Sequence, residues 1–228
     1  MIPWVHLDTA AVPGGRGTLK LMQRGAEFSI MADARILMNS RTSGSEMALA
    51  TLVRTRLHDR PDCRVLIGGY GMGFTLRAAL GEFGGDARIL VAELVPAVMA
   101  WARGPMAGLT AGCLDDPRVI VHEGDVRDMI ASRAGGFDAI ILDVDNGPGG
   151  FSRDANDRLY DVQGLVAARR ALRPKGILAV WSAAPDDKFA NRLGSTGFSV
   201  ENVKTRANNG RGGWHTIWIA TKTQSGRT

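Results

Sequence analysis

The sequence predicts an α/β protein built on a doubly wound, mostly parallel sheet. From Cys63 onward, short apolar runs typical of strands alternate with helical patterns, which implies βαβ units with helices on both faces of one sheet. Residues 65–73 pass from an apolar run through four glycines into a helical pattern. This order of strand, glycine turn and helix allows a backbone to approach a nucleotide closely.

The N-terminal part of the chain has a different pattern. Residues 18–40 should form a β-hairpin or short meander. Apolar residues stand at alternating positions in this segment, and Arg24-Gly25 and Asp33-Ala34 mark its turns. A helix capped by Ser43 or Ser45 should follow and end near Leu57. We therefore divide the chain into an N-terminal β-hairpin and helix, residues 1–60, and a Rossmann-like domain, residues 61–228, which we expect to bind a nucleoside and to carry any catalytic groups.

The second segment supplies the predicted sheet. Strands are expected near residues 63–67, 87–92, 118–122, 137–142, 176–181, 198–204 and 214–221. Helices are expected near residues 73–82, 95–107, 125–133, 156–172 and 186–194. Only a turn-rich loop separates the last two strands, so they should form an antiparallel hairpin at the end of the sheet.

Composition places the chain among ordinary globular proteins, with 45% hydrophobic and 22% charged residues in 228. No apolar run approaches the ~18 residues of a membrane span, and we expect no membrane partner. Two cysteines, Cys63 and Cys113, suggest a reducing compartment, so we expect a cytoplasmic protein. The net charge is +5, but residues 61–187 carry 13 basic and 17 acidic side chains. No nucleic-acid motif accompanies the basic ends, so we expect no nucleic-acid partner.

Ligands of doubly wound sheets lie beyond the carboxyl ends of the strands. Glu93 ends a predicted strand twenty residues after Gly73, where a carboxylate can accept hydrogen bonds from both hydroxyls of a ribose. Asp125 and Asp143 follow two further strands. The four histidines show no metal-ligand spacing and the cysteines no CxxC pair, so we predict no metal.

These motifs resemble the class I S-adenosylmethionine-dependent transferases and, within them, the spermidine synthase (polyamine aminopropyltransferase) family, over about residues 18–205. The resemblance implies a class I methyltransferase-like Rossmann fold. The segments that carry it are the glycine loop 68–73, Val91-Ala92-Glu93-Leu94, Asp116-Pro117-Arg118-Val119, Gly124-Asp125, the strand 137–143 and Leu172–Leu178.

The resemblance assigns a role to each matched residue. The cofactor would be S-adenosylmethionine or its decarboxylated form, with a small amine-type substrate as acceptor and a homodimer allowed. Its binding residues would be Gly68, Gly69, Gly71, Gly73, Glu93, Gly124 and Asp125. Asp143 would be the catalytic carboxylate. Asp145, one residue before the aligned position Asn146, is the second catalytic candidate. It would share a face with Asp143 if the backbone there is extended but not if it forms a turn. Glu46 and Asn146 would contact the substrate.

Several polar groups of the family's amine site are replaced in this chain. Gly71 stands where the family loop has an aspartate, and Asn146 where its catalytic loop has a second one. Gly44 and Ser45 replace a tyrosine and a histidine before the retained Glu46, and residues 181–184 replace a glutamine-containing segment. Three functions therefore stay open: aminopropyl transfer, methyl transfer, and a non-catalytic nucleoside-binding or assembly role.

Overall fold

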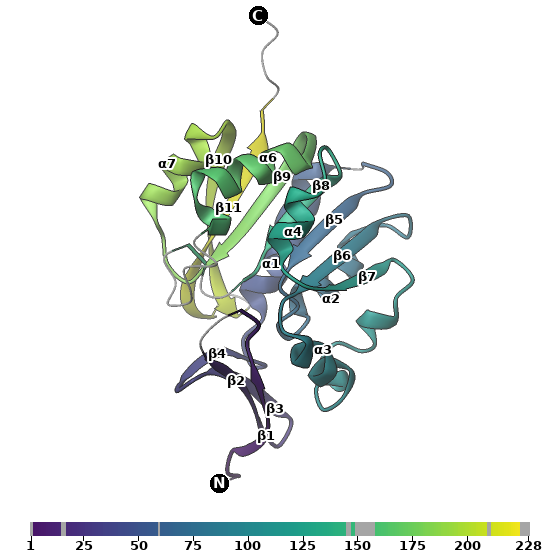
Figure 1. Cartoon of the computed structure of the whole chain (residues 1–228), viewed down its shortest axis with the longest axis vertical. Coiled ribbons are helices and arrows are strands. Elements are labelled where there is room, and N and C mark those ends of the chain that lie inside the picture. Colours follow the sequence, from purple (N-terminus) through teal and green to yellow (C-terminus); the bar gives the residue numbers. More distant parts are fainter. Residues whose placement is uncertain are drawn as a thin grey trace, which may run out of the picture.

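The computed structural model describes residues 2–14, 17–58, 60–144, 147–148, 158–208 and 211–223. The described strands form a small antiparallel sheet and a large, mostly parallel one, and the small sheet stands at one end of the large one (Figure 1). The small sheet consists, in order, of β1 (Val5–Ala11), β2 (Thr18–Arg24), β3 (Glu27–Ala32) and β4 (Arg35–Asn39).

The large sheet has the order β10-β11-β9-β8-β5-β6-β7. Strands β5 to β9 run parallel, whereas β11 is antiparallel to both β9 and β10. Their bounds are β5 (Arg64–Gly68), β6 (Arg88–Glu93), β7 (Val119–Glu123), β8 (Phe137–Leu142), β9 (Leu172–Ser182), β10 (Phe198–Asn208) and β11 (Arg211–Lys222). The predicted fold class, including the C-terminal antiparallel hairpin, is confirmed.

Helices cover both faces of the large sheet. They are α1 (Gly44–Leu57), α2 (Phe74–Glu82), α3 (Pro96–Arg103), α4 (Val126–Ala131), α6 (Val162–Ala171) and α7 (Asp187–Ser195), with 3-10 turns η1 (Ala107–Leu109) and η2 (Cys113–Asp115). Side chains alternate along a strand. Val65 and Ile67 of β5 therefore pack on the face of α1, α2 and α3, and Leu66 packs on the face of α4, α6 and α7. None of the described helices has the length and apolar character to cross a membrane.

The small sheet is larger than the sequence predicted, because β1 was not expected. Six of the seven β1 residues are exposed, and apolar and polar residues alternate only from Val5 to Asp8, which is a weak strand signal. It pairs antiparallel with β2, and Asp8 accepts a hydrogen bond of 2.7 Å from the Trp101 indole on α3. This contact ties the small sheet to α3, which packs against the large sheet.

Two helix starts also differ from expectation. Ser43 occupies the N-cap position of α1, but its hydroxyl makes no capping hydrogen bond. The hydroxyl of Ser45 donates to the Glu46 carboxylate instead. The helix expected over 156–172 is interrupted at Asp161. Residues 158–160 are helical, α6 begins at Val162, and residues 149–157 lie outside the described part.

Candidate functional site

The glycine loop between β5 and α2 is pressed against the end of β8. Gly69 has φ +81°, and a Cβ there would lie 2.7 Å from the carbonyl oxygen of Asp143. Gly73 has φ +78°, and a Cβ there would lie 2.6 Å from the Tyr70 hydroxyl. Because L side chains rarely adopt positive φ and neither position has room, both require glycine.

Glu93, the last residue of β6, is buried and holds this loop. Its Oε2 accepts a hydrogen bond of 2.9 Å from the Tyr70 backbone N–H, and its Oε1 accepts one of 2.9 Å from the Val95 N–H. The backbone carbonyl of Glu93 also accepts a bond of 2.8 Å from the N–H of Gly124, which follows β7. Glu93 thus joins the ends of three neighbouring segments around one edge of the sheet.

Asp125 is the N-cap of α4. Its Oδ1 accepts a bond of 2.8 Å from the Arg127 N–H, and its Oδ2 lies 2.6 Å from the Arg127 guanidinium. Burial raises the pKa of Asp125, but the hydrogen bonds from Arg127 outweigh it and hold the pKa below its ordinary value. Asp125 is therefore an ionised carboxylate at neutral pH.

Asp143 directly follows β8 and has the opposite electrostatic environment. Its Oδ2 accepts a hydrogen bond of 2.6 Å from the Thr75 hydroxyl on α2. Burial, and secondly the nearby carboxylate of Glu46, raise the pKa of Asp143 to about 7, while the Thr75 bond opposes this shift. A carboxylate with this pKa can both accept and release a proton near neutral pH.

Glu46 lies in the first turn of α1. Its Oε2 accepts a bond of 2.7 Å from the Ser45 hydroxyl, and burial raises its pKa. Since like charges disfavour each other in a buried site, Glu46 and Asp143 titrate as a pair. The chain thus has two interacting carboxyl groups beside the glycine loop.

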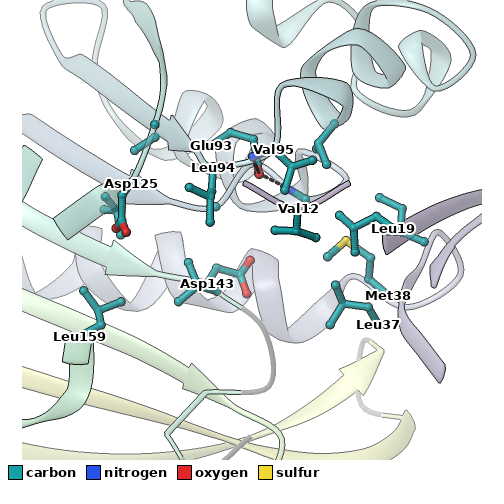
Figure 2. Close-up of a pocket in the computed structure, with 18 of the residues that line it drawn as sticks. Val12, Leu19, Leu37, Met38, Glu93, Leu94, Val95, Asp125, Asp143 and Leu159 are labelled. Atoms are coloured by element: carbon teal, nitrogen blue, oxygen red, sulfur yellow. Dashed lines mark hydrogen bonds between the residues drawn. The ribbon is translucent and has the colours of Figure 1, made fainter. Parts of the chain in front are cut away.

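One pocket joins these elements (Figure 2). Asp125 lies at one end of it, Asp143 points into its middle, and apolar side chains of the small sheet close the other end. Its apolar wall from the small sheet consists of Val12, Leu19, Ile30, Leu37 and Met38. Its described charged lining residues are Glu93, Asp125, Asp143 and Arg127, and the one base among them is paired with Asp125.

The structure brings most of the predicted site residues together. Those that line this pocket are Gly69, Gly71, Glu93, Gly124, Asp125 and Asp143. Gly68 and Gly73 shape the loop without lining the pocket, and Glu46 acts on Asp143 through its charge. Asp145 and Asn146 lie outside the described residues. Within the described ranges, no three histidine, cysteine or acidic side chains are grouped to hold a metal ion.

Sequence reasoning missed several residues that complete the site. Thr75 supports Asp143, and Arg127 supports Asp125, without a motif to mark either. The apolar wall residues of 18–40 were predicted as strand and Val12 was not, and nothing in their pattern indicated that they would face a ligand pocket. The position of this wall at the pocket depends on how the small sheet packs against the large one.

No protein-family model matches the chain. A polyamine aminopropyltransferase from Mycobacterium tuberculosis is 35% identical over 128 residues, which cover 53% of this chain. The sequence relatives found for this chain are named polyamine aminopropyltransferases. The resemblance expected from the motifs is thereby confirmed. The chain spans about a quarter of the length of that relative, 23%, and therefore matches only part of it.

Solved structures give the same fold. A spermidine synthase in complex with the transition-state analogue AdoDATO superimposes with a TM-score of 0.74 at 19% identity, covering 96% of this chain and 73% of that one. The O-methyltransferase TomG from Streptomyces achromogenes, in complex with SAM, gives a TM-score of 0.57 at 17% identity, covering 78% and 79%. At these identities the likeness establishes the fold, which hosts both types of transfer.

Proposed function

We propose that this chain binds S-adenosylmethionine or its decarboxylated form and transfers an aminopropyl or methyl group to a small amine-type nucleophile. The observation that carries the proposal is the single pocket in which the glycine loop, Glu93 and Asp125 meet Asp143. In the proposed complex Asp125 accepts a bond from the adenine amino group and Glu93 from the ribose. Asp143 then lies between the nucleoside end and the apolar end (Figure 2).

The proposed reaction is a direct displacement at a carbon bonded to the sulfonium sulfur. The lone pair of the acceptor nitrogen forms the new C–N bond while the C–S bond pair moves to sulfur, which leaves as a neutral thioether. The nitrogen loses one proton in the process, and Asp143 accepts it. Its pKa of about 7 suits this role, because the carboxylate is ionised at slightly alkaline pH and still basic.

Two features of the pocket favour aminopropyl transfer. Its described lining has three acids against one base, and that base is paired with Asp125. Its far wall, from the small sheet, is apolar. An extra carboxylate on the cofactor would have to be buried there without a cationic partner, which is costly. The decarboxylated cofactor brings no such charge.

Methyl transfer is the second candidate. The observation that favours it is Gly71, which lines the pocket where the family's loop carries an aspartate. Without that acid, the loop offers less compensation for the ammonium group of an aminopropyl chain. A non-catalytic nucleoside-binding role is the third candidate and predicts binding without turnover.

Mass spectrometry of the acceptor decides among the three. The protein is incubated with n-butylamine, putrescine or spermidine and with each cofactor in turn. Aminopropyl transfer adds a C3H7N unit to the acceptor and methyl transfer adds CH2. We expect the aminopropylated acceptor, formed from the decarboxylated cofactor. If neither product forms with any of the acceptors while the cofactor binds measurably, the result would support the non-catalytic role.

A further inference from the structure

His215 reaches the carboxyl pair from the far end of the chain. It lies on β11, where the antiparallel hairpin pairs it with Thr205 of β10. Its Nδ1 is 2.9 Å from the hydroxyl oxygen of Ser45, and that hydroxyl donates to Glu46 Oε2 at 2.7 Å. An imidazole, a hydroxyl and a carboxylate thus form one chain of hydrogen bonds ending beside Asp143.

The direction of this chain follows from proton counting. A serine hydroxyl has one hydrogen, which Ser45 gives to the Glu46 carboxylate. The bond between His215 and Ser45 must then use a proton on Nδ1, with Ser45 as acceptor. Burial lowers the pKa of His215, so the ring is neutral at pH 7 and its Nε2 carries a lone pair. Among the residues that the structure describes, Nε2 has no hydrogen-bond partner.

Trp181, at the end of β9, packs beside this ring. The two ring centroids are 4.8 Å apart with an edge-to-face angle of 73°. Trp181 is 9% exposed, and its indole N–H finds no acceptor among the described side chains and backbone. A buried donor without a partner is costly, so its retention calls for an explanation. Together with the free lone pair on His215, it marks a polar wall next to Glu46.

We propose that Trp181 and His215 form the acceptor-binding wall of this site. His215 is a positioning residue that holds Glu46 through Ser45, and its Nε2 accepts a hydrogen bond from an N–H of the bound amine. This inference rests on the proposed function. It adds a second polar contact for the acceptor, where sequence alone offered Glu46.

The first test observes His215 directly, by NMR of its ring nitrogens in protein saturated with methylthioadenosine. The Nδ1–H tautomer is expected at pH 7. n-Butylamine or putrescine should shift the Nε2 resonance of His215 and leave that of the exposed His58 unchanged. A proton found on Nε2 in the amine-free protein, or no shift with either amine, would overturn the proposal.

The second test compares His215→Asn with His215→Phe. Asparagine can keep a donor toward Ser45 but has no group at the Nε2 position, and phenylalanine keeps only the ring against Trp181. Both variants should lower kcat/KM for the amine by roughly tenfold or more, mainly through KM, because each loses a hydrogen bond to the acceptor. His215→Phe should lose more, since it also releases Glu46. The control is His58→Asn, at an exposed position with φ 50° that asparagine tolerates.

Calorimetry with methylthioadenosine separates this inference from the function on which it rests. Both His215 variants should bind the thioether within about twofold of wild type, because the wall contacts the acceptor only. Wild-type turnover by His215→Asn, or an equal loss of thioether affinity in both variants, would overturn the proposal. Failure of the wild-type protein to bind methylthioadenosine would contradict the proposed function itself.

Discussion

The hydroxyl of Thr75 donates a 2.6 Å hydrogen bond to Oδ2 of Asp143. Thr75 lies in the first turn of α2, directly after the glycine loop, and Asp143 lies at the end of β8. The bond fixes the carboxylate against the loop that we propose holds the cofactor. It also favours the ionised form, against the burial that raises the pKa of Asp143 to about 7.

Replacing Asp143 with asparagine should abolish most turnover without affecting nucleoside binding. The amide keeps the shape of the side chain and can still accept from Thr75, but it cannot take a proton. We expect kcat to fall by roughly a hundredfold or more while methylthioadenosine affinity changes little. The control is Asp187→Asn, an exposed position in the first turn of α7. An unchanged rate would remove Asp143 from the chemistry, and equal losses of rate and binding would make it a cofactor residue.

The pH dependence of the reaction should report the carboxyl pair. Since ionised Asp143 is the proton acceptor, its contribution to kcat/KM is lost as pH falls through about 7. Glu46→Gln removes a charge that raises this pKa and should shift the limb to lower pH. Thr75→Val removes a bond that lowers it and should shift the limb to higher pH. Using one acceptor throughout cancels its own titration, and shifts of the same sign in both variants would disprove this account.

Glu93 should matter for both the loop and the ligand. Glu93→Ala removes the acceptor of the Tyr70 and Val95 N–H groups, so it should lower the melting temperature. It should also weaken methylthioadenosine binding by roughly tenfold or more. Glu123 is the matched control, because it ends the neighbouring strand β7 in register with Glu93 but is exposed. Equal affinities of the two alanine variants would exclude Glu93 from the ligand site.

Two glycine-to-alanine substitutions should have opposite effects on stability. At Gly69, with φ +81°, the added Cβ would lie 2.7 Å from the Asp143 carbonyl oxygen, so the variant should lose more than about 1 kcal/mol. Gly81 lies inside α2, and beyond the backbone of the helix itself no described atom is within 4 Å of an added Cβ, so alanine there should add up to ~1 kcal/mol. Urea unfolding of the two variants measures both. Stabilisation at Gly69 would show that the loop does not adopt this conformation.

Putrescine should be a poor acceptor. A diamine carries two ammonium groups, and each needs compensation when it leaves water. Asp143 and the neutral His215 serve the reacting nitrogen. Glu46, whose pKa burial raises, is then the described carboxyl left for the distal ammonium. Release of methylthioadenosine from the decarboxylated cofactor is the assay. A kcat/KM for putrescine on the order of ~10⁴ M⁻¹s⁻¹ or more would refute this prediction.

The large sheet could be predicted because its signals are local. Buried strands such as β5 and β8 appear in the sequence as apolar runs. Glu93 ends β6 twenty residues after Gly73, and Asp125 follows Gly124 directly after β7. Strand β1 could not be predicted in the same way, because its apolar–polar alternation covers only Val5 to Asp8 and it buries no apolar run. Asp125 is also the N-cap of α4, where its side chain accepts from the Arg127 N–H.

The acceptor side of the site could not be predicted from local patterns. His215 and Ser45 meet across 170 positions, and their contact depends on an antiparallel strand that places the C-terminal hairpin beside α1. The spacing of the two residues along the chain does not predict such a contact. The pocket wall from the small sheet has the same cause, since Met38 faces Gly71 only because the two sheets meet there.

Isothermal titration calorimetry with S-adenosylmethionine, its decarboxylated form and methylthioadenosine tests the central claim most directly. The pocket predicts binding of adenosyl ligands, tighter for the decarboxylated cofactor than for S-adenosylmethionine, and at least tenfold weaker binding to Glu93→Ala. No heat and no thermal shift with any of the three ligands at millimolar concentration would contradict it.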